Sequence, residues 1–201
     1  MEINNRQKII NICFVILIVF FCIISIKLYK VNQNNKNTIQ EYHNRMMNRA
    51  LINIDQAVNL LDKYKANKKP NLLFQVASEL DAASDFIQEF RTYYEYNSES
   101  ISGLIIEGTE FFIAYKGVVN RWGLALQNED LEKIPSDEQI EIYRKDIQEI
   151  SNAFRDNFKE KKNTLSYEKL IETIFELVKK TKSEEVKSNF SKFVLKDKVF
   201  K

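Results

Sequence analysis

The sequence predicts an all-α protein in which one N-terminal transmembrane helix is followed by an antiparallel four- to five-helix bundle. Three observations support this fold class. First, four Gly and two Pro in 201 residues are far below average usage, and together with abundant Lys, Glu, Ile and Leu they favour long helices. Second, a long apolar run lies close to the N-terminus. Third, apolar residues in the rest of the chain recur three and four positions apart, which is the helical spacing.

The apolar run "IINICFVILIVFFCIISI" covers Ile9 to Ile26 and extends through Leu28 and Tyr29. As a helix it measures about 27 to 32 Å at about 1.5 Å per residue, which is enough to cross the hydrocarbon core of a bilayer. We therefore expect residues 1–8 to be a short N-terminal tail. Residues 9–29 are expected to be a transmembrane signal anchor whose partner is the lipid bilayer.

Two other interpretations of this segment are weaker. A cleaved secretory signal has a shorter apolar run that ends in small residues, whereas this run ends in "CIISIKLYK" without an A-x-A pattern. Lipid attachment at Cys22 generally needs a small residue before the cysteine, and Phe21 stands there. The sequence thus favours a single uncleaved span.

The direction of the span is close to a tie by the positive-inside rule, which compares Lys and Arg near the two ends. Arg6 and Lys8 precede the span, and Lys27, Lys30 and Lys36 lie at its other end. In single-span proteins a short basic tail before a large C-terminal domain is more often cytoplasmic. We therefore expect a cell-membrane protein with its N-terminus inside and an extracytoplasmic helical domain.

The polar stretch "VNQNNKNT", residues 31–38, shows no apolar periodicity, which is typical of a connection. It predicts a short juxtamembrane linker over residues 30–38 or, alternatively, a solvated helical stalk. Residues 39–201 are expected to form the helical bundle domain.

Apolar spacing in this domain predicts several helices with short links. They cover 39–66, 71–97 and 101–127, then a fourth from "PSDEQ" to about residue 162, and a fifth that opens at "NTLSYEKL". Ser136 and Gln139 are placed to form a capping box at the fourth helix, and Ser183 is expected to cap a further short helix. Long helices with short links are expected to run antiparallel to their neighbours.

The predicted helix over 101–127 has the widest apolar face and contains all four glycines, Gly103, Gly108, Gly117 and Gly123. The wide face predicts a helix that is more enclosed than its neighbours. Each glycine inside a helix costs about 1 kcal/mol relative to alanine, so we expect close helix packing or a local kink. The alternative is a candidate pocket beside Phe112, Tyr115 and Trp122.

A column of carboxylates, Asp81, Asp85 and Glu89, lies along the helix over 71–97. We expect it to face solvent or the basic side chains of the helix over 39–66, which are Arg45, Arg49, Lys63 and Lys65; a bound cation is the alternative. Carboxylate-bridged metal bundles normally add Glu-x-x-His motifs, and the single histidine, His43, lies in none. His43 with Met46 and Met47 suggests a soft-metal site, but methionines at helical spacing are usually core residues, so no metal or cofactor is predicted.

The C-terminal segment "SNFSKFVLKDKVFK" is basic and contains several large apolar residues. Lys192, Phe193, Lys196 and Lys198 are candidates for contact with an anionic membrane surface. The favoured alternative is a basic last helix that completes the bundle.

The sequence contains no nucleophile elbow, phosphate-binding loop or cysteine–histidine pair in the domain, so an enzyme is not expected. Residues 1–30 carry a net charge of +3, which leaves −1 for the rest of the chain and argues against a nucleic-acid partner. Two classes remain. The first is a membrane-anchored interaction or sensory module that binds a protein or a small ligand. The second is a structural or assembly component of a membrane or envelope complex, which self-associates.

The layout of a span followed by long helices is similar to the helical sensing domains of bacterial membrane receptors. This similarity concerns the fold alone. The second span and the cytoplasmic signalling region of such receptors are not in this sequence.

Overall fold

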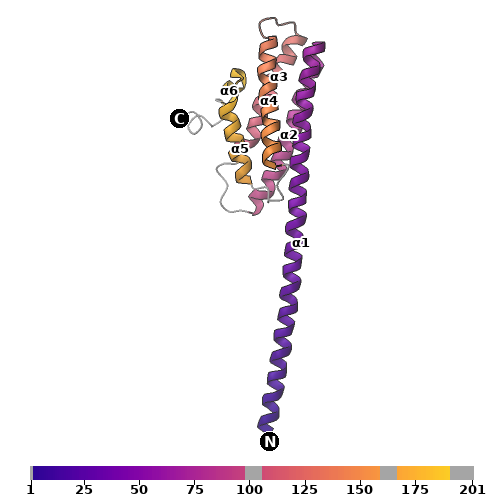
Figure 1. Ribbon diagram of the computed structural model, residues 1–201, viewed down its shortest axis with the longest axis vertical. Coiled ribbons are helices and arrows are strands. Elements are labelled where there is room, and N and C mark those ends of the chain that lie inside the picture. The colour runs from indigo at the N-terminus through magenta and orange to yellow at the C-terminus, as the bar shows by residue number, and fades with distance from the viewer. Residues whose placement is uncertain (1, 98–105, 159–166, 191–201) are drawn as a thin grey trace. The chain divides into compact units, whose positions relative to one another are not determined.

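The computed structural model describes residues 2–97, 106–158 and 167–190, which form six α-helices and no strand. In chain order the helices are α1 (Glu2–Asn67), α2 (Pro70–Asn97), α3 (Ile106–Gln127), α4 (Asp137–Phe158), α5 (Tyr167–Lys180) and α6 (Glu184–Phe190) (Figure 1). The all-α fold class predicted from the sequence is confirmed for these residues.

The chain divides into two compact units, Met1–Tyr42 and His43–Lys201. The described part of the first unit is helical throughout and includes the polar stretch 31–38. Within it, the Gln33 amide donates to the Tyr29 hydroxyl at 3.1 Å, and the Thr38 hydroxyl donates to the Asn34 carbonyl at 2.9 Å. The stretch is therefore helical, and its role as a linker or a stalk stays a prediction.

The predicted break between the span and the first helix of the domain is therefore not seen. The helix that we expected to begin at residue 39 is part of α1. The physical reason is that residues 1–69 contain neither Gly nor Pro, so no residue in this stretch breaks a helix strongly. The predicted starts at 101 and near 163, and the predicted end at 162, lie outside the described residues.

In the second unit, residues near the start of one helix contact residues near the end of the next helix in two pairs of helices. The Phe74 ring of α2 lies against Gly123 of α3, and further along α2 Asp81 pairs with Lys116 at 2.5 Å. For α3 and α4, the Phe112 ring packs on Phe154, while the Tyr143 hydroxyl donates to the Tyr115 carbonyl at 2.9 Å. Each of these two pairs of helices is antiparallel.

The core of the second unit takes apolar side chains from all six helices. Its largest fully buried side chains include Tyr64, Phe111, Phe112, Tyr115, Tyr143, Phe154 and Phe190. Helix α3 supplies three of these rings and packs against α2, α5 and α6 as well as α4. The prediction that this helix is strongly enclosed is confirmed.

Local signals end and begin the helices near the predicted positions. After α1, Lys68 adopts φ 54° and its N–H donates to the Tyr64 carbonyl at 2.7 Å, which is a left-handed C-terminal cap. Pro70 then opens α2, at a position where a missing N–H costs nothing.

The two predicted serine caps are also present. The Ser136 N–H donates to Gln139 Oε1 at 2.7 Å and the Gln139 N–H donates to Ser136 Oγ at 3.1 Å, so the capping box of α4 is confirmed. At α6, Ser183 Oγ accepts the Val186 N–H at 3.4 Å.

Replacing Gly123 by alanine tests the packing of α2 on α3. A Cβ at this position would lie 2.9 Å from the Phe74 ring, so the ring must move. We expect Gly123→Ala to lower the free energy of unfolding by about 1 kcal/mol. This is the balance between overpacking, about 1–3 kcal/mol, and the gain in helix propensity, about 1 kcal/mol. Urea unfolding in detergent, followed by circular dichroism, measures it.

The control for this prediction is the same glycine substitution in a Phe74→Ala background. Without the ring only the propensity gain remains, so the substitution should then raise the free energy of unfolding by about 1 kcal/mol. Equal destabilisation in both backgrounds would show that the contact with Phe74 is not the cause.

Candidate functional site

The apolar part of α1 exposes its side chains. From Phe14 to Val31 all the large hydrophobic residues except Ile24 are more than half exposed, with Phe14 at 64% and Leu17 at 51%. The most apolar window of this helix has a mean hydropathy of 2.4 and no buried residue. Its length and composition suit a membrane crossing. Within the described residues, one helix near the N-terminus is therefore a candidate membrane span.

The three aromatic residues of the candidate pocket lie in the core of the second unit. Phe112, Tyr115 and Trp122 are all buried. The centroid of the Phe112 ring is 6.1 Å from that of Phe154, and the Trp122 centroid is 5.2 Å from that of Tyr143, both in edge-on arrangements. Access of a ligand to these three side chains stays a prediction.

Two glycines of α3 have close neighbours on other helices. Gly123 faces the Phe74 ring, and a Cβ at Gly117 would lie 3.4 Å from the Asn189 amide nitrogen of α6. Close packing, the first of our two explanations, is confirmed at these two positions. Gly103 lies outside the described residues.

In the carboxylate column of α2, Asp81 has a partner on α3. Asp81 pairs with Lys116 of α3, and Lys65 of α1 pairs with Glu141 of α4, each at 2.5 Å. Asp81 is about half exposed, which agrees with a column that faces solvent; whether the column also faces the basic side chains of α1 stays a prediction. No group of three His, Cys, Asp or Glu among the described residues could hold a metal ion.

Met46 and Met47 are buried, as we expected of methionines at helical spacing, and His43, which is near them in the sequence, is buried as well. Burial lowers the pKa of His43 below its usual 6.5, so the imidazole is neutral at pH 7.

The candidate membrane-surface residues Lys192, Phe193, Lys196 and Lys198 lie outside the described residues, and their contact with lipid stays a prediction.

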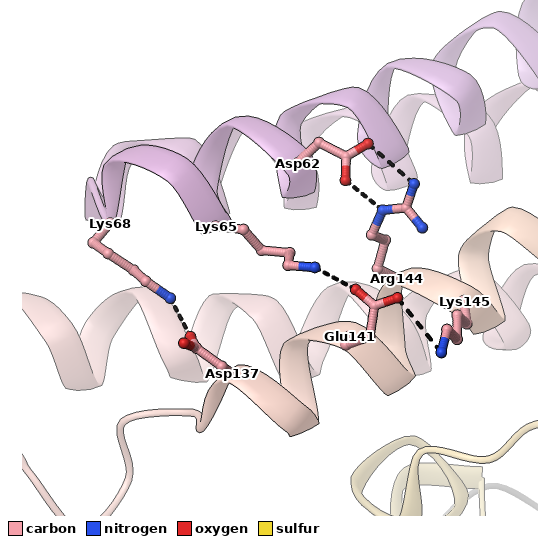
Figure 2. A network of polar contacts seen from close by, with 7 residues as sticks. All are labelled: Asp62, Lys65, Lys68, Asp137, Glu141, Arg144 and Lys145. Carbon is pink, nitrogen blue, oxygen red and sulfur yellow. Dashed lines mark hydrogen bonds and ion pairs between the residues drawn. The ribbon is translucent and has the colours of Figure 1, made fainter.

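A row of ion pairs joins the second-unit part of α1 to α4 (Figure 2). Arg144 donates to both carboxylate oxygens of Asp62, through Nε at 2.5 Å and Nη2 at 3.1 Å. One turn along, Lys65 donates to Glu141 at 2.5 Å, and Lys68 pairs with Asp137. At the other end Arg155 donates to Asp55 at 2.7 Å. We call this set the α1–α4 seam: Asp55, Asp62, Lys65 and Lys68 with Asp137, Glu141, Arg144 and Arg155.

The order of charges in the seam specifies the direction of the two helices. Each helix carries two acidic residues followed by two basic ones. In the observed antiparallel arrangement every pair is attractive, whereas a parallel arrangement in the same register would bring like charges together. Exposed ion pairs contribute only about 0.2–1 kcal/mol each. The seam therefore selects a direction and register more than it adds stability.

A second polar cluster is buried at the connection between α5 and α6. Asp146 of α4, 4% exposed, accepts the Lys182 N–H at 3.0 Å and the Ser183 N–H at 2.8 Å. On the same connection the Thr181 and Tyr115 hydroxyls lie 3.0 Å apart, in a hydrogen bond in which either can donate. We call Asp146, Tyr115 and residues 181–183 the polar junction. It fastens the start of α6 to α3 and α4.

Burial changes the protonation behaviour of the polar junction. Desolvation raises the pKa of Asp146 above 3.8, and the backbone N–H groups of Ser183 and Lys182 only partly offset this effect. Desolvation also raises the pKa of Tyr115 well above 10.0. The tyrosine is consequently neutral at pH 7 and can either donate or accept a hydrogen bond.

Sequence patterns did not single out Asp146, although a signal was present. The residue lies on the apolar face of α4, between Tyr143 and Ile150 and next to Ile147. A carboxylate within an apolar stripe indicates a buried polar group that requires partners. The identity of those partners, which are backbone N–H groups some 36 positions away, could not be read from spacing.

Reversing one charge of the seam tests its role. We expect Asp62→Arg to lower the free energy of unfolding by about 1 kcal/mol, because it replaces an exposed attraction by repulsion from Arg144. The double variant Asp62→Arg with Arg144→Asp should recover most of the loss, as measured by urea unfolding in detergent. No recovery in the double variant would contradict a pairwise charge interaction at this position.

Removing the Asp146 carboxylate tests the polar junction. Asp146→Ala leaves two N–H groups without their acceptor, and we expect a loss of about 1–3 kcal/mol in the free energy of unfolding. Asp146→Asn retains one acceptor oxygen and should lose less. A loss below about 0.5 kcal/mol for the alanine variant, which is the size of an ordinary surface effect, would contradict the assignment.

The asparagine variant also gives a pH test. Because the folded-state pKa of Asp146 is raised, the unfolded chain ionises first as the pH increases. The stabilisation from this group is complete below about pH 3.8 and is lost as the pH rises through the folded-state pKa. The asparagine variant cannot ionise, so it should gain stability relative to the wild type between about pH 3.5 and pH 7. A constant difference, or a shift in the opposite direction, would contradict the raised pKa.

Comparison of the chain with protein families, with curated proteins and with solved structures finds no match.

Proposed function

We propose that this chain is a single-pass, membrane-anchored protein whose second unit is an antiparallel helical bundle that acts as an interaction or sensory module at the membrane. The exposed apolar segment of α1 carries the proposal. Full burial of one large apolar side chain contributes about 1.5–3 kcal/mol, so more than a dozen such side chains in water are strongly unfavourable. A helix satisfies its own backbone hydrogen bonds, and therefore it can place this segment in lipid.

The bilayer partner in this proposal contacts residues 9–29, and the second unit lies outside the cytoplasm with the N-terminus inside. The basic residues at the two ends of the span are nearly balanced. The direction thus rests on the short length of the N-terminal tail, and it needs a direct test.

The antiparallel bundle is supported by the helix pairs of the second unit. The α1–α4 seam, the Phe74–Gly123 contact and the Tyr143–Tyr115 hydrogen bond all connect helices that run in opposite directions. Short links between long helices give the same arrangement.

A role in interaction or sensing fits the way the second unit uses its polar groups. The seam and the polar junction hold helices together, and the most buried carboxylate among them, Asp146, is occupied by backbone N–H groups. A protein partner fits this arrangement better than a reaction does. The near-neutral charge outside the first 30 residues does not favour nucleic acid.

A reporter that is active only outside the cytoplasm, fused after Lys201, tests anchoring and direction together. We expect an active, membrane-bound fusion that detergent extracts and high salt does not. Leu17→Asp with Phe20→Asp should give a soluble, inactive fusion, because each carboxylate at the centre of a span costs about 2.5–3.5 kcal/mol.

The matched control adds the same two charges outside the span. Asn34→Asp with Asn37→Asp should leave activity and membrane binding unchanged, since acidic residues contribute little to orientation. A membrane-bound but inactive wild-type fusion would overturn the proposed direction and keep the anchor. A soluble wild-type fusion would overturn the anchor itself.

A further inference from the structure

Helix α6 covers an aromatic face of α3. The Phe190 ring stacks on Phe111 with 5.6 Å between centroids and 17° between planes, and it meets Tyr115 edge-on at 6.3 Å. Val186, one turn earlier, is fully buried as well. The surface beneath α6 is therefore an apolar groove built from α3 side chains.

Polar contacts hold the same helix against α3 and α4. The Asn189 amide donates to the Ala114 carbonyl at 2.9 Å and accepts from Arg121 at 3.3 Å. Glu185 accepts from the Gln139 amide at 2.8 Å. A carbonyl inside a helix has an intrahelical donor of its own, so release of Asn189 does not leave Ala114 without a partner.

The connection that precedes α6 is fastened separately. Asp146 accepts the N–H groups of Lys182 and Ser183, and Thr181 bonds to Tyr115. None of these bonds involves a side chain of α6. The polar junction can therefore stay closed while α6 leaves its groove.

The helical structure of α6 depends on the groove. Its described part, Glu184–Phe190, has seven residues, whereas an isolated helix needs about 12–15 residues to be even marginally stable in water. Contact with α3 is consequently required for the helix to form, so docking and helix formation occur together. Segments of this kind open locally at a lower free energy than the whole domain.

We propose that α6 is a releasable strap that detaches from α3 as one unit, while residues 181–183 remain fastened, and so uncovers the groove at Phe111 and Tyr115. Gly117 is part of the device, because the absence of a Cβ lets the Asn189 amide approach α3. The strap does not depend on the proposed membrane anchoring, since every contact that forms it lies in the second unit.

Hydrogen exchange of the full chain in detergent micelles, resolved by mass spectrometry, tests the strap. We expect the backbone amides of Val186–Phe190 to open at least about tenfold more often than those of Phe111–Trp122, with little dependence on low denaturant concentrations. Asn189→Ala should raise the opening of α6 about fivefold, the effect of one lost hydrogen bond, and leave α3 unchanged.

Two further variants separate release of the strap from general destabilisation. Gly117→Ala crowds Asn189 but favours the α3 helix, so α6 should open more often and α3 should not. Val58→Ala, in the core on α1, should speed exchange of α3 and leave α6 unchanged.

Exchange of α6 and α3 at one common rate in the wild type would overturn the strap. So would equal acceleration of both helices by Asn189→Ala or by Gly117→Ala, because either result would make α6 part of a single cooperative core.

Discussion

The second unit depends on the enclosure of α3. Its aromatic and branched residues Phe111, Phe112, Tyr115, Val118, Val119 and Trp122 are all buried and form one wide face of the helix. Such a wide apolar face cannot be covered by one neighbour, and it requires α2, α4, α5 and α6 around it. Close approach is possible because two positions carry no side chain: Gly123 receives the Phe74 ring and Gly117 receives Asn189.

Apolar burial of this kind holds helices together but does not determine their direction, since it is non-directional. Charge order and buried hydrogen bonds supply that information. The α1–α4 seam is attractive in one direction and repulsive in the other. Asp146 then fixes the place where α5 ends and α6 begins, because the backbone at that connection offers N–H groups to its buried oxygens.

The ion pairs of the α1–α4 seam and the hydrogen bonds of the polar junction differ in how much each contributes to stability, because they differ in exposure to solvent. Seam residues such as Asp62 are about half exposed, so salt screens them and each pair contributes little. Asp146 is buried, and a buried acceptor is costly to lose. Loss of Asp146 therefore acts on the connection that precedes α6, whereas loss of one seam pair has a small effect on the pairing of α1 with α4.

By itself, the sequence determined the helices and the candidate span. Periodic apolar residues and the capping pair Ser136 with Gln139 are local signals, and they determine where helices form and begin. It also indicated that the helix with four glycines would be enclosed. Only the tertiary structure determined which groups on other helices the charged side chains contact. Asp81 meets Lys116, Lys65 meets Glu141, and Asp146 meets N–H groups far along the chain. Each of these contacts depends on which helices become neighbours, and that is set by the fit of whole apolar faces rather than by any spacing along one helix.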